Sequence, residues 1–200
     1  MKKYAFEKSR AKRKNRKESI DKKPRYDIMI GMMKNLENEQ LKIDALVKAP
    51  KTCAFSGHRE LGRDFSVLNL KREIKKLIER GVETFYCGMA QGFDLTAGEV
   101  VLALKKKYEN INLVACIPCE NQYKYYSLDE KKRYAQILKK ADETVVLSGD
   151  YYKGCMLARN RYMADRADVL ICYCKKEIGG TAYTVNYFSK KYPLKEKVFL

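Results

Sequence analysis

Six short apolar runs along this chain are typical of buried strands: residues 52–55, 84–87, 112–117, 144–147, 169–173 and 197–200. They show little polar alternation, as expected for parallel strands that are covered on both faces. Helical patterns lie between them, and strands that alternate with helices form right-handed βαβ units. The pattern therefore predicts an α/β, three-layer fold with a mostly parallel sheet over residues 51–200.

Two of the intervening helices carry end signals. Leu70, Ile74, Leu77 and Ile78 follow helical spacing, and Gly81 comes where the glycine after a helix belongs. Residues 127–130 read Ser-Leu-Asp-Glu, a capping-box sequence that predicts the start of another helix.

The first fifty residues differ from the rest. Residues 1–25 form a basic arm with too little apolar content to order itself, so we expect disorder there. Residues 26–50 are predicted to be a helical extension, with an apolar stripe on one side. Two alternatives are open for that stripe: it packs on the domain, or on a second subunit of a homo-oligomer. The stripe consists of Met29, Met32, Met33, Leu36, Ile43 and Val47.

Composition narrows the class of protein. Hydrophobic residues make up 46% of the 200, and no apolar run approaches eighteen residues. We therefore expect a cytoplasmic protein without a membrane partner. The formal net charge of +17 favours a nucleic-acid or acidic protein partner, with residues 1–25 as the contact surface. A lysine-rich proteome explains the same charge without such a partner.

The seven cysteines sit mostly within or beside apolar runs, and their number is odd. This predicts small buried hydrophobes in a reducing compartment rather than disulfides. Cys116 and Cys119 form a C-x-x-C pair, but no second pair or histidine cluster completes a zinc site. We predict no metal site.

Three glycine-bearing loops follow predicted strands: residues 56–57, 88–92 and 179–180. Glycine lets a ligand approach the backbone, and the start of the following helix favours negative charge. Parallel strands bring their carboxyl ends together, where ligands bind. The three loops therefore predict a phosphate or nucleotide site. No G-x-G-x-x-G or phosphate-loop motif is present, which disfavours nicotinamide dehydrogenases and phosphate-loop NTPases.

Several motifs occur in an order that resembles the YpsA-like branch of the SLOG superfamily. They are Ser56-Gly-His-Arg59, Gly88-Met-Ala-Gln-Gly-Phe-Asp94, Ile117-Pro-Cys119, Arg159-Asn-Arg161 with Asp165 and Asp168, and Gly179-Gly-Thr181. The resemblance covers residues 52–200 and groups the chain with the cytokinin-activating LOG proteins and the DNA-processing protein A group. It implies a Rossmann-like fold and a nucleotide-derived ligand in the first, second and fifth loops after the strands.

From the loops and the resemblance together we take thirteen candidate ligand-binding residues: Ser56, Gly57, His58, Arg59, Gly88, Met89, Gly92, Asp94, Pro118, Asn160, Gly179, Gly180 and Thr181. LOG enzymes follow their glycine loop with G-T-x-x-Glu. Here Ala182, Tyr183 and Thr184 follow Thr181, so the glutamate of that mechanism is missing. We therefore expect a binding protein, a sensor or regulator, rather than an enzyme, and name no catalytic residue and no certain cofactor.

Each candidate also has a structural explanation. His58 either contacts the ligand or orders its loop, and Arg59 either binds an anion or pairs with Asp94 or Asp168. Asp94 either bonds a ribose hydroxyl or caps its helix. Arg159 and Asn160 either read the ligand or, in the case of the arginine, lie on a solvated helix face.

Two further functions remain as alternatives. The first is single-stranded nucleic-acid binding, for which the basic arm is suited, and so are the tyrosines at positions 123, 125 and 126 beside Gln122. Core packing, or a lid over the site, explains these tyrosines equally well. The second is hydrolysis of a nucleotide N-glycosidic bond, against which the missing glutamate counts.

Overall fold

The computed structural model of the chain describes residues 26–40 and 49–200. Contacts divide it into two units, Met1–Lys48 and Ala49–Leu200, so the division falls two residues before the predicted boundary. The predictions for the arm, and for Ile43 and Val47 of the stripe, lie outside the described residues.

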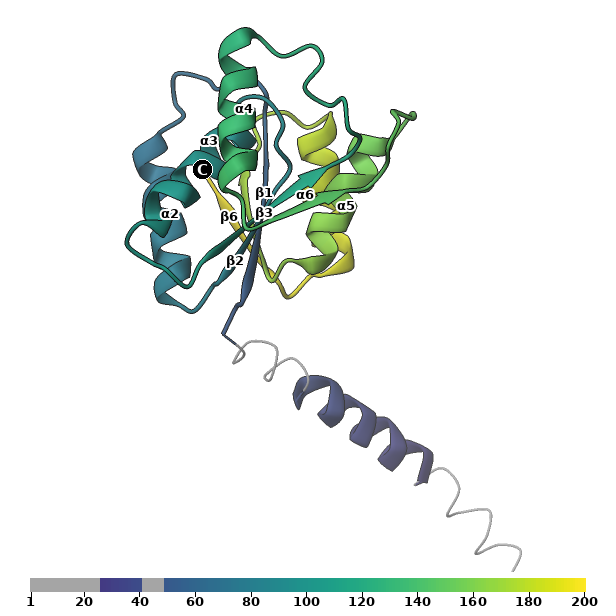
Figure 1. Cartoon of the computed structure of the whole chain (residues 1–200). Helices are drawn as coiled ribbons and strands as arrows, with labels where there is room; N and C mark the ends of the chain where they lie inside the picture. The colour runs from purple at the N-terminus through teal and green to yellow at the C-terminus, as the bar shows by residue number, and fades with distance from the viewer. Residues whose placement is uncertain (1–25, 41–48) are drawn as a thin grey trace, which may run out of the picture. The chain divides into compact units, whose positions relative to one another are not determined.

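The second unit is the predicted α/β domain. A parallel sheet of six strands runs in the order β4-β3-β2-β1-β5-β6 (Figure 1). The strands are β1 (Thr52–Gly57), β2 (Thr84–Cys87), β3 (Asn112–Ile117), β4 (Glu143–Val146), β5 (Val169–Tyr173) and β6 (Glu196–Phe199). The Rossmann-like α/β class is confirmed, and the sheet is parallel throughout. Strand order reverses between β1 and β5, which places the switch point at the carboxyl ends of these two strands.

Helices cover both faces of the sheet. They are α2 (Val67–Glu79), α3 (Phe93–Lys105), α4 (Leu128–Lys140), α5 (Cys155–Arg166) and α6 (Gly180–Lys191). Helices α2, α3 and α4 pack together on one face, while α5 and α6 pack on the other (Figure 1). Two buried clusters fill the layers. One contains Phe55, Phe85 and Phe93, and the other contains Met163 and Phe188.

The predicted helix ends are in place. Gly81 follows α2 with φ of 102°, a backbone conformation that favours glycine. Ser127 and Glu130 form both hydrogen bonds of a capping box at the start of α4. The local sequence signals therefore mark these two helix ends correctly.

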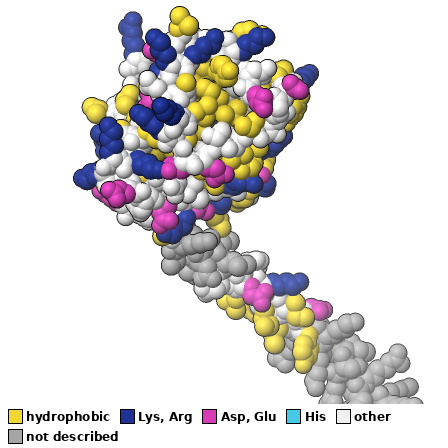
Figure 2. Space-filling model, in the orientation of Figure 1, with side chains coloured by type: hydrophobic (Ala, Val, Ile, Leu, Met, Phe, Trp, Pro, Cys, Tyr) yellow, Lys and Arg dark blue, Asp and Glu magenta, His cyan; other side chains and the backbone are white. Residues whose placement is uncertain are grey.

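Residues 26–40 of the first unit are helical, as predicted. The side chains of Met29, Met32, Met33 and Leu36 are exposed there. On the face of the domain drawn in Figure 2, Lys and Arg are spread out and interspersed with Asp and Glu. None of the helices in the described ranges has the length and apolar character of a membrane span.

The seven cysteines are free thiols, and all except Cys174 are buried, as the sequence predicts. Burial raises the pKa of the Cys116 thiol to about 12. Within residues 26–40 and 49–200, no group of three or more His, Cys, Asp or Glu side chains is arranged to hold a metal ion.

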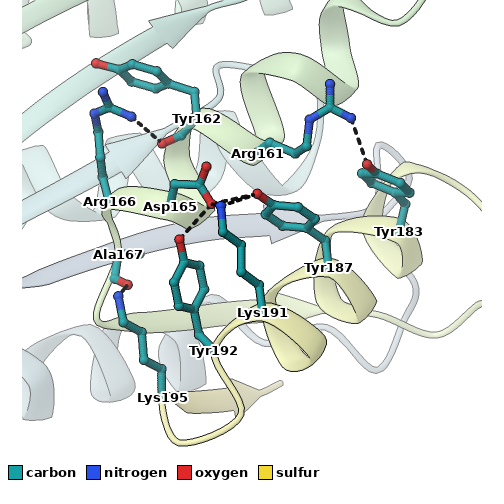
Figure 3. Close-up of polar contacts among 10 residues, drawn as sticks. All are labelled: Arg161, Tyr162, Asp165, Arg166, Ala167, Tyr183, Tyr187, Lys191, Tyr192 and Lys195. Atoms are coloured by element: carbon teal, nitrogen blue, oxygen red, sulfur yellow. Dashed lines mark hydrogen bonds and ion pairs between the residues drawn. The ribbon is translucent and has the colours of Figure 1, made fainter. Parts of the chain in front are cut away.

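Asp165 joins α5 to α6. One of its oxygens, Oδ1, accepts hydrogen bonds from Tyr187 Oη at 2.8 Å, Lys191 Nζ at 2.8 Å and Tyr192 Oη at 2.9 Å (Figure 3). Asp168 joins β5 to β1. Its Oδ2 accepts hydrogen bonds from the backbone amides of Lys51 and Thr52, where β1 begins. Both aspartates are therefore structural links.

Replacing Asp165 by Asn should lower the free energy of unfolding by about 1–2 kcal/mol, because a neutral amide oxygen accepts these three hydrogen bonds less strongly. This loss of stability is small because the Asp165 carboxylate is partly exposed to solvent. Urea denaturation at pH 7 measures it. Asp150→Asn, at an exposed loop position, is the matched control and should change little. An Asp165→Asn protein as stable as the native one would contradict the assigned role.

Candidate functional site

A pocket of about 460 Å³ opens where the strands end at the switch point. Loops after β1, β2, β3 and β5 reach it, together with the start of α5, although the resemblance implied only the first, second and fifth loops. Nine of the thirteen candidates line it: Ser56, Gly57, His58, Arg59, Asp94, Asn160, Gly179, Gly180 and Thr181. The three loops therefore converge as expected, and the loop after β3 and the start of α5 also contribute.

Gly88 and Gly92 do not line the pocket, and their lack of a side chain serves packing. A Cβ on Gly92 would lie 2.0 Å from the carbonyl oxygen of Arg59, and the residue has φ of 72°. A Cβ on Gly88 would lie 2.2 Å from Arg159 Nη1 and 2.6 Å from Asp94 Oδ2. Protein atoms thus occupy the space that we had assigned to a ligand.

Backbone amides at the start of α3 also bond to protein atoms rather than facing the pocket. His58 O accepts a hydrogen bond from the Phe93 amide, and Ala90 O accepts one from the Leu95 amide. These donors are therefore not free to bind an anion. Direct ligand contact by Gly88 and Gly92 stays a prediction without support from the pocket.

Met89 and Pro118 are also buried outside the pocket lining. Met89 has φ of 58°, unusual for a residue with a side chain, and its carbonyl accepts a hydrogen bond from Tyr126 Oη at 3.1 Å. Such a conformation costs about 1–3 kcal/mol and persists only where the surroundings hold it. The hydrogen bond from Tyr126, in the loop after β3, thus holds the turn around Met89 in this conformation.

His58 orders two loops. Its Nε2 accepts a hydrogen bond from the Lys175 amide at 2.8 Å, which links the loop after β1 to the loop after β5. Burial, followed by the nearby charge of Lys176, lowers the pKa of this imidazole. Neutral His58 is the form that can accept this bond. The side chain of Arg59 is exposed and makes no ion pair with Asp94, Asp168 or any other residue that the structure describes.

Asp94 is buried within the pocket lining, with 4% of its surface exposed. It does not cap α3, since Gly92 occupies that position. Instead Oδ2 accepts a hydrogen bond from the Ala90 amide at 3.3 Å. Burial raises the pKa of this carboxyl to about 6, against the opposing influence of Arg159, the Ala90 amide and Arg59.

Arg159 is buried, with 4% exposed, so the interpretation as a solvated face is wrong for this residue. It donates to Asn160 Oδ1 at 2.8 Å, and Asn160 Nδ2 donates to Thr184 Oγ1 at 2.8 Å. Thr184 Oγ1 in turn donates to Gly180 O at 2.7 Å. This chain of hydrogen bonds ties the start of α5 to the start of α6 beneath the pocket.

Sequence reasoning left Arg159 out of the candidate set, although a signal existed. Cys155, Arg159 and Met163 follow i, i+4, i+8 spacing and all three are buried. Arg161 and Arg166, off that spacing, are exposed. Tyr125 and Tyr126, which the sequence suggested for base stacking or as a lid, line the pocket as well. Gln122 and Lys176 also line it, although they are not among the thirteen candidates.

The amino end of α6 is open toward the pocket. Gly179, with φ of 115°, precedes the helix and provides no side-chain cap. The first amides, those of Gly180, Thr181 and Ala182, donate to no described residue. A helix start with unpaired amides is a ready anion site.

Two bacterial proteins illustrate the similarity in sequence. A UPF0398 protein from Halalkalibacterium halodurans is 29% identical over 147 residues, covering 72% of this chain and 77% of that protein. The SPbeta prophage-derived protein YoqJ from Bacillus subtilis is 28% identical over 144 residues, covering 64% of this chain and 84% of its own length.

Two solved structures share the fold. One is the structure of DNA processing protein A from Helicobacter pylori, described by its single-stranded DNA binding mode. Its TM-score with this chain is 0.55 at 24% sequence identity, and the match covers 76% of this chain and 65% of that one. The other is DNA processing protein A from Streptococcus pneumoniae, with a TM-score of 0.52 at 20% identity, over 70% of this chain and 47% of that one. This chain therefore spans less than two thirds of either protein, and the likeness concerns the fold.

The family model agrees with the resemblance drawn from the motifs. The YpsA model, described as the YspA SLOG family, matches residues 64–198, which is more than half of the chain and begins after the Ser56–Arg59 loop. By this match the chain belongs to the YspA SLOG family.

Proposed function

We propose that this protein binds a nucleotide or nucleotide derivative in the pocket at the switch point, as a sensor or regulator. The observation that carries the proposal is the open start of α6, whose unpaired amides lie at a pocket built by four loops and the start of α5. Backbone donors and the helix dipole together favour a phosphate group there.

Charge around the pocket supports an anionic ligand. Arg59, Arg159 and Lys176 line it, and Asp94 is the one carboxylate among the lining residues. A volume of about 460 Å³ is within the range of small-molecule sites. The exposed side chain of Tyr125 lies at the same pocket and offers a face for a base.

Replacing Gly180 by Asp should weaken binding of phosphate ligands by at least about tenfold, because the new carboxylate repels an anion at the start of α6. A Cβ at this position meets nothing within 4 Å, so the side chain fits. Acidic residues in a first turn stabilise helices by about 0.3–1 kcal/mol, so stability should be kept or raised. Calorimetric titration with AMP, ADP, ADP-ribose and pyrophosphate measures the loss.

Gly180→Asn is the matched control, since it adds the same volume without the charge. It should retain most of the binding that Gly180→Asp loses. Equal affinity of the native protein and both variants would remove α6 from the site. Failure of the native protein to bind any phosphate ligand would overturn the proposed function.

A second candidate is single-stranded nucleic-acid binding. The formal charge of +17 and the fold shared with DNA processing protein A favour it. Affinity for an oligonucleotide should then fall steeply with salt, because phosphate contacts release counterions. Removing residues 1–25 should reduce both affinity and salt slope. An unchanged slope would exclude the arm as the contact surface.

A further inference from the structure

The outward side of helices α5 and α6 combines tyrosines with arginines. Arg161 Nη1, on α5, donates a hydrogen bond to Tyr183 Oη, on α6, at 2.8 Å. Arg166, also on α5, places its guanidinium carbon 3.6 Å from the centre of the Tyr162 ring. Both arginines are exposed and both tyrosines are partly exposed. Figure 3 shows the two pairs on either side of Asp165, and we call the surface formed by these two pairs the tyrosine–arginine face.

Carboxylates do not neutralise the positive charge of the tyrosine–arginine face. Neither Arg161 nor Arg166 makes an ion pair with a residue that the structure describes. Asp165 is the one acidic residue of the two helices, and its Oδ1 pairs with Lys191 Nζ at 2.8 Å. Lys190, near the end of α6, is exposed and adds a further positive charge. An excess of positive charge on one surface attracts polyanions.

Arginines at the end and on the outer side of α2, across the sheet, are held differently. Arg72 pairs with Glu73 at 3.2 Å, and Arg80 pairs with Glu196 at 2.6 Å. Acidic partners therefore cancel the charge of these two arginines, whereas tyrosines hold those of α5. A tyrosine orders a guanidinium without removing its charge. The tyrosine–arginine face thus presents ordered cations that an anionic partner can still bind.

The tyrosine rings indicate which kind of anion fits. Tyr187 and Tyr192 pack against the buried cluster of Met163 and Phe188, so core packing explains them. Tyr183 lies outside that cluster, and its ring is nearly parallel to that of Tyr187, with centres 6.3 Å apart. A simple anion needs no aromatic surface. A single nucleic-acid strand offers phosphates to arginines and unpaired bases to rings.

Resting on the second candidate function, we infer that the tyrosine–arginine face binds single-stranded nucleic acid. Arg161 and Arg166 contact the phosphates, and the ring of Tyr183 stacks on a base. Each guanidinium has five N–H donors, and the hydrogen bonds to Tyr183 Oη and to the Tyr162 carbonyl use one of each, so others can reach a phosphate.

The inferred surface differs from the two regions considered above. None of the four residues of the tyrosine–arginine face lines the pocket at the switch point. The face is also distinct from residues 1–25, to which the net charge alone had assigned a nucleic-acid partner. A strand can therefore bind here while the pocket holds a nucleotide.

Fluorescence anisotropy with the full chain and a labelled oligothymidylate of about 20 nucleotides, at pH 7.5 and several salt concentrations, tests the phosphate contacts. Replacing Arg161 and Arg166 together by Gln should lower affinity about tenfold at low salt. The slope of log affinity against log salt should fall by about 1.4, because each single-strand phosphate contact contributes about 0.7. Replacing Arg72 and Arg80 together by Gln removes the same charge across the sheet and is the matched control. Equal losses in the two double variants would overturn the assignment, since net charge alone would explain them.

Two variants of Tyr183 test the stacking. Both Tyr183→Phe and Tyr183→Leu lose the hydrogen bond from Arg161, but only the first keeps an aromatic ring. Tyr183→Leu should bind the oligonucleotide about fivefold more weakly than Tyr183→Phe, a value at the low end for stacking on one base. An abasic phosphodiester oligomer of the same length should bind equally to both variants. Equal affinity of the two variants for the oligothymidylate would overturn the contact between Tyr183 and a base.

The outcomes separate this inference from the functions proposed above. If the full chain binds the oligothymidylate and the variants of the tyrosine–arginine face bind it as tightly, the inference fails and nucleic-acid binding stands. If the full chain binds no oligonucleotide, the inference and the second candidate function fail together. Neither result bears on nucleotide binding in the pocket, which the titrations of Gly180→Asp test separately.

Discussion

Alanine in place of Gly92 should destabilise the domain by about 3–5 kcal/mol, the largest effect we expect from one added methyl group. The new Cβ would lie 2.0 Å from the Arg59 carbonyl oxygen and 2.5 Å from its carbon, and both are backbone atoms. The residue also has φ of 72°, which side chains rarely adopt. Urea denaturation followed by circular dichroism measures the loss.

Two other glycines of the loops around the pocket give graded controls. Gly180→Ala adds a methyl group where nothing lies within 4 Å and should change stability by no more than about 0.5 kcal/mol. Gly88→Ala should be intermediate, because the atoms it meets belong to the side chains of Arg159 and Asp94. If Gly92→Ala proved as mild as Gly180→Ala, the loop after β1 would not be held against α3 as described.

The fold was predictable because buried parallel strands are written as short apolar runs. Residues 84–87, 112–117 and 169–173, all interior strands, match their predicted bounds. Bounds shift by one residue at β4 and β6, which are the edges of the sheet and are less buried. β1 extends two residues further than its apolar run, since Ser56 and Gly57 continue the pairing with β5.

The site was predictable only in part, because its buried polar groups depend on contacts between distant loops. The glycine loops showed where the pocket would form, and the resemblance led to the ligand class that we propose for it. Nothing local shows that Gln122 would hold Gly88 from 34 residues away. The same holds for Gly92, whose close neighbour is a carbonyl of another loop rather than a ligand.

Exchange of Asp94 for Asn should make the protein more stable at pH 7, by about 1–3 kcal/mol. The folded-state pKa of about 6 exceeds the ordinary value of 3.8, so the folded protein holds this proton more tightly than the unfolded chain. The stability that this group contributes is complete below pH 3.8 and is lost as the pH rises through 6. Above pH 6 the native protein keeps a charge buried.

Denaturation of both proteins in urea between pH 4 and pH 8 tests this expectation. Their free energies of unfolding should agree near pH 4 and diverge as Asp94 ionises, since His58 titrates in both and cancels in the difference. A constant difference across this range would mean that Asp94 is not the titrating group. A gap that grows with pH would mean that the native chain gives up stability to hold a carboxylate at its pocket, as expected for a residue retained to bind a ligand.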